Sequence, residues 1–242
     1  MKLVLLIAHC LVWVFAARSA ETNTIERQKL IVSVASADGE LQGIPFAEVV
    51  LATTGKRVLS LDQKNEGDRL LLSKIGRAMD EVMKRMNATN SAAQKPKRIN
   101  EVSSHFEGEI KKVLNETEGF SCDYPRLASG KIQRAGYPDL RLVDRKSSRT
   151  VYLDPKLYAA GSRSSSFRTF YFEPKTETNK ILEDACHLIV GFEHDGGKTG
   201  GWKFLSWQLV DLSRFKVRLK AEFQGSNQDL YQAEAIVGQS EK

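Results

Sequence analysis

The chain has 242 residues and a formal net charge of +6. This length fits one medium-sized domain, or one domain with an N-terminal extension. A modest basic excess is compatible with a polyanionic partner but does not identify one, because many exported proteins are basic. The sequence contains no cluster of cysteine and histidine of the zinc-binding type, so a structural zinc site of that kind is excluded.

Residues 1–20 have the features of a secretory signal peptide. Lys2 precedes an apolar stretch, and small residues follow where cleavage would fall. The apolar stretch is shorter than the roughly 20 residues of a spanning helix, although an uncleaved anchor is the alternative. No second apolar run is long enough to cross a membrane. We therefore expect a secreted or periplasmic protein with no stable membrane insertion after cleavage, and loss of Lys2 and Arg18 lowers its charge from +6 to +4.

Cleavage of this peptide also removes Cys10 and leaves two cysteines, Cys122 and Cys186. In an oxidising compartment two cysteines can form one disulfide. Two buried thiols are the alternative, and the sequence leaves both open.

The polar, proline-containing segment 87–98 suggests a boundary. It divides the mature chain into strands and a helix at 21–98, packed on or preceding the core, a core at 99–237 and a disordered tail at 238–242. Turn signals between short apolar runs predict two or three strands within residues 29–62.

Two helices are predicted from apolar positions at helical spacing, at residues 67–86 and 99–116. Glu107 and Glu109 flank the apolar face of the second helix on opposite sides. Either carboxylate could therefore point into a cleft beside the core.

Residues 136–223 are expected to be rich in strands. The predicted strands are 136–144, 150–159, 165–174, 187–195, 203–212 and 215–223, with a short helix at 177–185. The first two strands are joined by the basic turn 145–149.

Each of these first two strands carries an aspartate beside a proline: Pro138-Asp139 and Asp154-Pro155-Lys156. The chain has five triplets of an acidic residue, any residue and lysine, and most such triplets are solvated ion pairs. The triplet at 154–156 differs because an apolar run leads into it and a matching strand precedes it across a tight turn. Pairing of the two strands would bring Asp139 and Asp154 together, with Asp154 and Lys156 on one face.

Two carboxylates that converge on one face repel each other unless a cation lies between them. Mg²⁺ suits such a pair, because it is held by one or two carboxylates together with substrate phosphate and water. A nearby lysine can activate the attacking water or stabilise negative charge in the transition state. These groups together indicate phosphodiester hydrolysis.

The arrangement resembles the PD-(D/E)xK nuclease superfamily, whose members are restriction-endonuclease-like. The resemblance covers roughly residues 100–195 and includes the order of a helix with acidic residues followed by the two signature strands. It implies an α/β fold with a central mixed β-sheet flanked by helices. It also implies an exported endonuclease that uses Mg²⁺, or Mn²⁺, and no small-molecule cofactor to cleave nucleic acid, with DNA as the expected substrate.

Carried over to this chain, the resemblance implies that Asp139, Asp154 and the main-chain carbonyl of Pro155 bind the metal. Lys156 would position or activate the water, and Glu107 is the expected catalytic glutamate of the first helix, with Glu109 as its alternative. Proline at position 155 departs from the usual pattern. Because it lacks an N–H, it requires a strand edge or a bulge.

A second triplet, Glu173-Pro174-Lys175, competes with Asp154-Pro155-Lys156 for the lysine half of the signature. It has no hairpin link to Asp139, so we favour the first triplet. His187 flanks an apolar strand and is interpreted as a structural histidine.

Basic residues near the motif are expected to contact nucleic-acid phosphates without reading sequence. They are Lys131, Arg134, Arg163 and Arg168. The oligomeric state has no signal in the sequence. The alternative to a nuclease is a catalytically silent exported protein of the same fold that binds nucleic acid or interacts at the envelope; such a protein would shift DNA in a salt-dependent manner and cut nothing.

Overall fold

The computed structural model describes residues 24–36, 41–167, 169–197, 200–220, 222 and 224–238. The predicted signal peptide, Arg168 and most of the predicted tail lie outside these ranges. The chain forms two compact units: one comprises residues up to 44 and from 217 onward, and the other comprises residues 45–216. Residues 45–98 therefore belong to the same unit as the predicted core, and the structure does not divide at residue 98.

In the first unit, residues 24–36 are helical and a short helix, α5, spans Asn227–Leu230. The Ser226 side chain accepts a hydrogen bond from the Asp229 N–H, and the Asp229 side chain accepts one from the Ser226 N–H, so the two residues form a capping box at the start of α5. Strands β1 (Ile44–Pro45) and β8 (Lys216–Val217) pair as a two-stranded sheet. Across the described ranges, no helix combines the length and apolar character needed to traverse a membrane.

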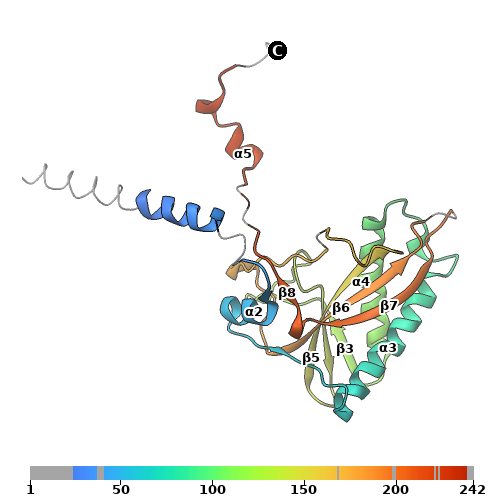
Figure 1. The fold of residues 1–242 in the computed structure, drawn as a ribbon. Coiled ribbons are helices and arrows are strands. Elements are labelled where there is room, and N and C mark those ends of the chain that lie inside the picture. Colours follow the sequence, from blue (N-terminus) through green and yellow to red (C-terminus); the bar gives the residue numbers. More distant parts are fainter. Residues whose placement is uncertain are drawn as a thin grey trace, which may run out of the picture. The chain divides into compact units, whose positions relative to one another are not determined.

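The second unit is built on a six-stranded mixed sheet with the order β2-β6-β5-β4-β3, and β7 also pairs with β6. The strands are β2 (Val58–Leu59), β3 (Phe120–Asp123), β4 (Leu140–Asp144), β5 (Arg149–Ala159), β6 (Ala185–His194) and β7 (Phe204–Asp211). The central strands β5 and β6 are parallel, whereas β4 runs antiparallel to β5 and β7 to β6. With helices on the sheet, this is the α/β architecture that the sequence predicts (Figure 1).

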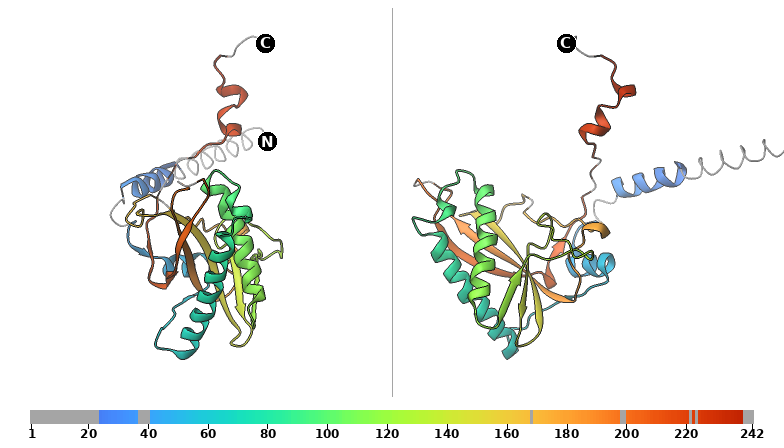
Figure 2. Two further views of the ribbon diagram at one scale, coloured as in Figure 1. Left: turned by 90° about the vertical axis from the view of Figure 1, so that its right-hand side faces the viewer. Right: turned by 180° about the vertical axis from the view of Figure 1, so that it is seen from behind.

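Two long helices, α3 (Glu66–Met86) and α4 (Ile99–Glu116), cover one face of the sheet, as the turned views in Figure 2 also show. Both predicted helices are confirmed, the second to the residue. Their buried side chains pack with alternate residues of the central strands into one core. The helical part of this core is Leu71, Ile75, Ala78, Met79, Val82, Met86, Val102, Phe106, Ile110, Val113 and Leu114.

Two or three strands were predicted within residues 29–62, where the structure has the two-residue strands β1 and β2. The helix α2 (Phe46–Thr54) between them was not predicted. The helix begins after Pro45 and ends at Gly55, which adopts the left-handed conformation with φ 69°. β-Branched residues in 49–54 suggested a strand, but Phe46 and Val50, one helical turn apart, are the buried pair.

Phe46 is the centre of a second, aromatic cluster on the sheet face opposite α3 and α4. The cluster consists of Phe46, Tyr137, Phe170, Phe172, His187 and Phe215. It explains why the predicted strand 165–174 is wrong: in its described part the segment is irregular, yet Phe170 and Phe172 still point inward to Phe46. Aromatic packing, rather than a strand ladder, holds it.

Four predicted strands, β4, β5, β6 and β7, are confirmed with shifted ends. The sequence analysis missed β3. It also predicted a helix at 177–185, where the described residues form only the 3₁₀ turn η2 (Thr176–Thr178). Of the long strand predicted at 215–223, the described residues form only β8, and residues 218–220 are irregular.

Side-chain amides replace strand neighbours at two junctions. Asn87, at the end of α3, bonds both the N–H and the carbonyl of Phe204 on β7. Asn115, near the end of α4, bonds both the N–H and the carbonyl of Cys122 on β3. Each carboxamide therefore ties a helix end to a strand as a backbone neighbour would.

Cys122 and Cys186 are both buried free thiols. They lie on one row of the sheet but three strands apart, on β3 and β6. With strands spaced about 4.8 Å apart, this separation is far beyond the reach of a disulfide. Burial raises the pKa of Cys122 to about 12 and that of Cys186 to about 11, so neither thiol is reactive.

Phe106 on α4 tests the core, because its ring packs against Phe192 and Phe204 at centroid distances of 4.5 and 4.7 Å. We expect Phe106→Ala to lower the free energy of unfolding by about 3–5 kcal/mol. Urea denaturation measures the loss, with the exposed residue Ile132→Ala as a control of little effect. A loss below about 1 kcal/mol in Phe106→Ala would contradict this packing.

Candidate active site

The antiparallel register of β4 and β5 determines where the two predicted aspartates meet. The last paired residues of this ladder are Leu140 and Leu153. Asp139 precedes Leu140 and Asp154 follows Leu153, so the two aspartates are the next residues beyond the paired part of the two strands. Besides burial, the Asp154 carboxyl raises the pKa of Asp139, so the two carboxyl groups lie near each other at this end of the hairpin.

Asp154 is 2% exposed, although it carries a carboxylate. Lys156 shares its face of β5, and the Lys156 Nζ lies 2.5 Å from Asp154 Oδ2. No hydrogen bond of good geometry reaches this Oδ2 from the described residues. A buried carboxylate oxygen with spare coordination capacity is suited to accept a cation.

The pKa of Asp139 is raised by its burial and by its position beside Asp154. Burial raises its pKa most, and the neighbouring Asp154 carboxyl raises the pKa further. Lys156 opposes the rise, and Glu107 adds to it. Two neighbouring carboxyl groups cannot both ionise at little cost, so Asp139 keeps its proton to a higher pH than an isolated aspartate until a cation binds beside it.

Pro155 lies where strand pairing allows a proline. Strand β4 pairs with β5 only as far as Leu153, so from Asp154 onward β5 has one free edge and pairs with β6 on the other. The requirement for a strand edge at Pro155 is thereby met, and the missing N–H leaves no gap in the β4–β5 ladder.

The two candidate glutamates of α4 occupy different environments. Glu107 faces the aspartates, because its charge acts on Asp139, and its carboxylate bonds Arg134 at 2.7 Å. Glu109 instead pairs with Arg85 of α3 at 3.0 Å. The structure therefore brings Glu107 to the site and commits Glu109 to the α3–α4 interface.

Lys180, which the sequence analysis did not select, faces the same site. The residue is 1% exposed, and burial lowers its pKa, whereas the charges of Asp139, Asp154 and Glu107 oppose this effect. Nothing in the local sequence marks a lysine that will be buried, because only the fold brings it near the aspartates.

Tyr137 and His187 adjoin the site from the aromatic cluster. The Tyr137 hydroxyl lies 2.6 Å from His187 Nδ1. Burial lowers the pKa of His187 to about 4, and the imidazole is therefore neutral. The interpretation of His187 as a structural histidine agrees with these contacts.

The predicted nucleic-acid contacts are dispersed. Lys131 is exposed, and Arg134 is exposed apart from its ion pair with Glu107 and its stacking on Tyr124 at 4.7 Å. Arg163 lies over the Tyr158 ring and 3.6 Å from Glu193. Its ion pair is with this glutamate and not with Asp139 or Asp154. Arg168 is outside the described residues.

The competing triplet is separate from the site. Glu173 and Lys175 pair with each other at 2.6 Å, and both side chains are about half exposed in an irregular segment. No strand carries them, and neither residue acts on the charge of Asp139. Asp154 and Lys156 are therefore the acidic residue and lysine that lie beside Asp139.

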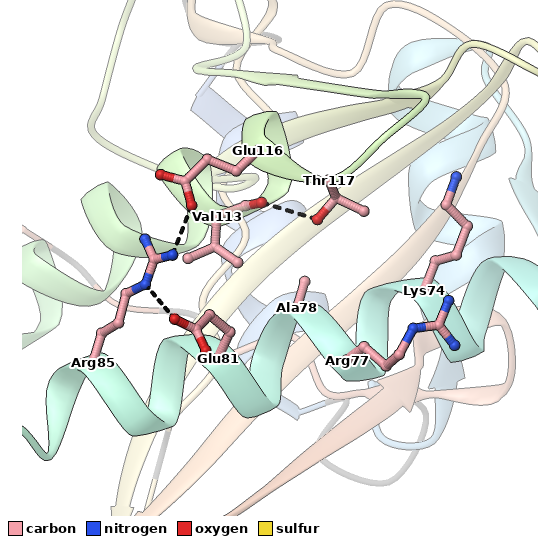
Figure 3. A pocket seen from close by; sticks show the side chains of 8 residues that line it. All are labelled: Lys74, Arg77, Ala78, Glu81, Arg85, Val113, Glu116 and Thr117. Carbon is pink, nitrogen blue, oxygen red and sulfur yellow. Dashed lines mark hydrogen bonds and ion pairs between the residues drawn. The ribbon is translucent and has the colours of Figure 1, made fainter.

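A hollow of about 300 Å³ lies elsewhere, between α3 and α4. Arg85 crosses it to bond Glu81 and Glu116, and Lys74 and Arg77 line its other end (Figure 3). Lys74 also lies 3.9 Å from Asp144 of β4, and the hollow contains none of the predicted site residues.

The donor set at the aspartates is small. Within the described ranges, no three residues among His, Cys, Asp and Glu gather closely enough to hold a metal by themselves. Asp139, Asp154 and the Pro155 carbonyl offer two carboxylates and one neutral oxygen. This set excludes a closed structural site but fits Mg²⁺, which retains several waters or substrate oxygens.

Two comparisons with known proteins bear on this site. The family model of the type II restriction enzyme MjaV family matches residues 39–234. The type II restriction enzyme MjaV of Methanocaldococcus jannaschii is 30% identical over 208 residues, which cover 81% of this chain and 89% of that protein. The matched range includes the aspartates, Lys156, Glu107 and Lys180.

The raised pKa of Asp139 predicts how stability depends on pH. Without metal, the folded protein retains a proton on this carboxyl that the unfolded chain releases above about pH 4. The unfolding free energy should therefore fall as pH rises from that point to the raised pKa, by at most about 1.4 kcal/mol per pH unit.

Urea denaturation in EDTA across this range, on wild type and Asp139→Asn, isolates the effect. The stability difference between them should grow in favour of Asp139→Asn as pH rises. A stability difference between the two proteins that stays constant with pH would contradict the raised pKa of Asp139.

Proposed function

Because this chain belongs to the MjaV family of type II restriction enzymes, we propose that it is an endonuclease that hydrolyses phosphodiester bonds of DNA with a PD-(D/E)xK site. The observation that carries the proposal is the proximity of Asp139 to Asp154 beside the Lys156 ammonium. The β4–β5 ladder supports it, because Asp139 and Asp154 flank its last pair, Leu140 and Leu153.

In the proposed site, Asp139, Asp154 and the Pro155 carbonyl hold Mg²⁺, or Mn²⁺ in its place. The proximity of the two carboxyl groups and the raised pKa of Asp139 both support a cation there, beside the Lys156 ammonium that already pairs with Asp154 Oδ2. When bound, the ion supplies charge neutralisation at the scissile phosphate and acidifies the attacking water.

Lys156 would stabilise the charge that develops on the phosphate oxygens. Its ammonium already lies 2.5 Å from the Asp154 carboxylate and is partly exposed, so it can reach substrate without a large movement. Glu107 would accept a proton or orient water at the edge of the site, with Arg134 fixing its carboxylate.

DNA would approach along the exposed basic residues beside these carboxylates. Lys131 and Arg134 remain exposed in the segment that precedes Asp139, whereas Arg141 and Arg149 are engaged by Glu183 and Asp68. Contacts from such residues position the backbone and carry no sequence information.

Incubation of DNA with the protein and Mg²⁺, Mn²⁺ or EDTA tests the activity. We expect metal-dependent cleavage that EDTA stops and Asp154→Ala abolishes. Lys156→Met should lower kcat about 10²–10³-fold, because one charged donor to the transition state is lost.

Cleavage by Asp154→Ala at the wild-type rate would overturn the site. A wild-type protein that shifts DNA in a salt-dependent manner and cuts nothing would instead favour the silent binding protein.

We also propose that residues 1–20 are removed on export to a secreted or periplasmic location. The family model matches from residue 39 onward, so the leader pattern lies outside the matched range. In the native host, N-terminal sequencing of the purified protein should begin near residue 20 or 21. An intact Met1 on protein recovered from the cytoplasm would contradict export and leave the nuclease proposal unaffected.

A further inference from the structure

The backbone ladder that aligns β4 with β5 begins at Leu140, one residue after Asp139. The position of Asp139 therefore depends on the segment Gly136–Pro138 that leads into it. Two buried side chains hold this segment, and both come from β6 or from the residues just before it.

Lys180 is the first of these anchors. Its Nζ donates a hydrogen bond to the Gly136 carbonyl at 2.5 Å. The residue is 1% exposed, a burial that an unpaired ammonium would not tolerate. Its charge is balanced electrostatically by Asp139, Asp154 and Glu107. Because it is buried, Lys180 is able to fix the segment but does not reach DNA.

His187 is the second anchor. On β6 it lies beside Tyr152 of β5, and its Nδ1 meets the Tyr137 hydroxyl at 2.6 Å. Phe46 packs on both rings, at 5.6 Å from Tyr137 and 6.1 Å from His187. The Tyr137 ring is thereby held two residues before Asp139 in a buried aromatic cluster.

We propose that Lys180 and His187 are positioning residues that hold Gly136 and Tyr137, and thereby place Asp139 opposite Asp154 for metal binding. The inference rests on the proposed function. It extends the site beyond the signature residues to β6, the other neighbour of β5. Precise placement is needed because Mg²⁺ requires near-ideal geometry at about 2.0–2.1 Å from its oxygens.

Because Lys180 is positively charged, the direction in which its removal changes metal affinity distinguishes simple repulsion of the metal from a positioning role. Removal of a cation that did nothing except repel a metal would tighten metal binding. Loss of a positioning contact would weaken binding even though a positive charge has gone. Tyr137→Phe changes no charge and keeps the ring, so it tests the His187 contact alone.

The experiment compares wild type, Lys180→Met, Tyr137→Phe and the control Lys175→Met, an exposed lysine in a neighbouring segment. Calorimetry measures Mn²⁺ affinity on the DNA-free protein, and steady-state cleavage separates kcat from KM. We expect Lys180→Met and Tyr137→Phe to lose about 10–100-fold in Mn²⁺ affinity and to show a reduced kcat. The KM for DNA and the behaviour of Lys175→Met should match wild type.

Thermal unfolding in EDTA identifies a variant that fails to fold; if Lys180→Met does so, Tyr137→Phe alone decides the inference. Folded variants with unchanged or tighter Mn²⁺ binding, beside an active wild type, would overturn the positioning role and leave the nuclease proposal intact. A wild type that neither binds Mn²⁺ nor cuts DNA would overturn the proposed function and the inference with it.

Discussion

The site depends on one constraint, which is the proximity of the Asp139 and Asp154 carboxyl groups at the end of the β4–β5 ladder. The Leu140–Leu153 register brings Asp139 and Asp154 to the same end of the β4–β5 ladder. A fold that buries such a pair must surround it with compensating groups. Here those groups are cationic: Lys156 on the same strand, Lys180 before β6, and Arg134 on the adjoining Glu107. Each cation comes from a different part of the chain, so the electrostatic balance of the site is a property of the whole unit.

One face of the sheet carries the main hydrophobic core, and the opposite face carries the candidate site residues. The face under α3 and α4 is a continuous aliphatic and aromatic core that needs no polar partner. The opposite face carries Tyr152, Asp154 and His187 at alternate positions along β5 and across to β6, with Phe46 of α2 covering the imidazole. Since neighbouring residues of a strand point to opposite faces, one strand serves both purposes.

Local patterns in the sequence predicted the parts of the molecule that local forces form. Helix α4 and the β4–β5 hairpin follow from spacing and turn residues, and with them the meeting of Asp139 and Asp154. Helix α2 and the irregular 165–174 segment were mispredicted because the aromatic cluster, a tertiary feature, overrides β propensity there. Lys180 could not be found at all, since a buried lysine differs from an exposed one only in its distant neighbours.

The carboxamides of Asn87 and Asn115 have a consequence for producing the protein. Each begins an Asn-x-Thr sequence of the kind glycosylated in eukaryotic secretion, yet each side-chain nitrogen is already bonded to a strand carbonyl. A sugar attached to the nascent chain would replace one of the two hydrogens of that nitrogen and would have to fit at the junction of the helix end with β7 or β3. A host that does not glycosylate these asparagines leaves both carboxamides as the structure has them.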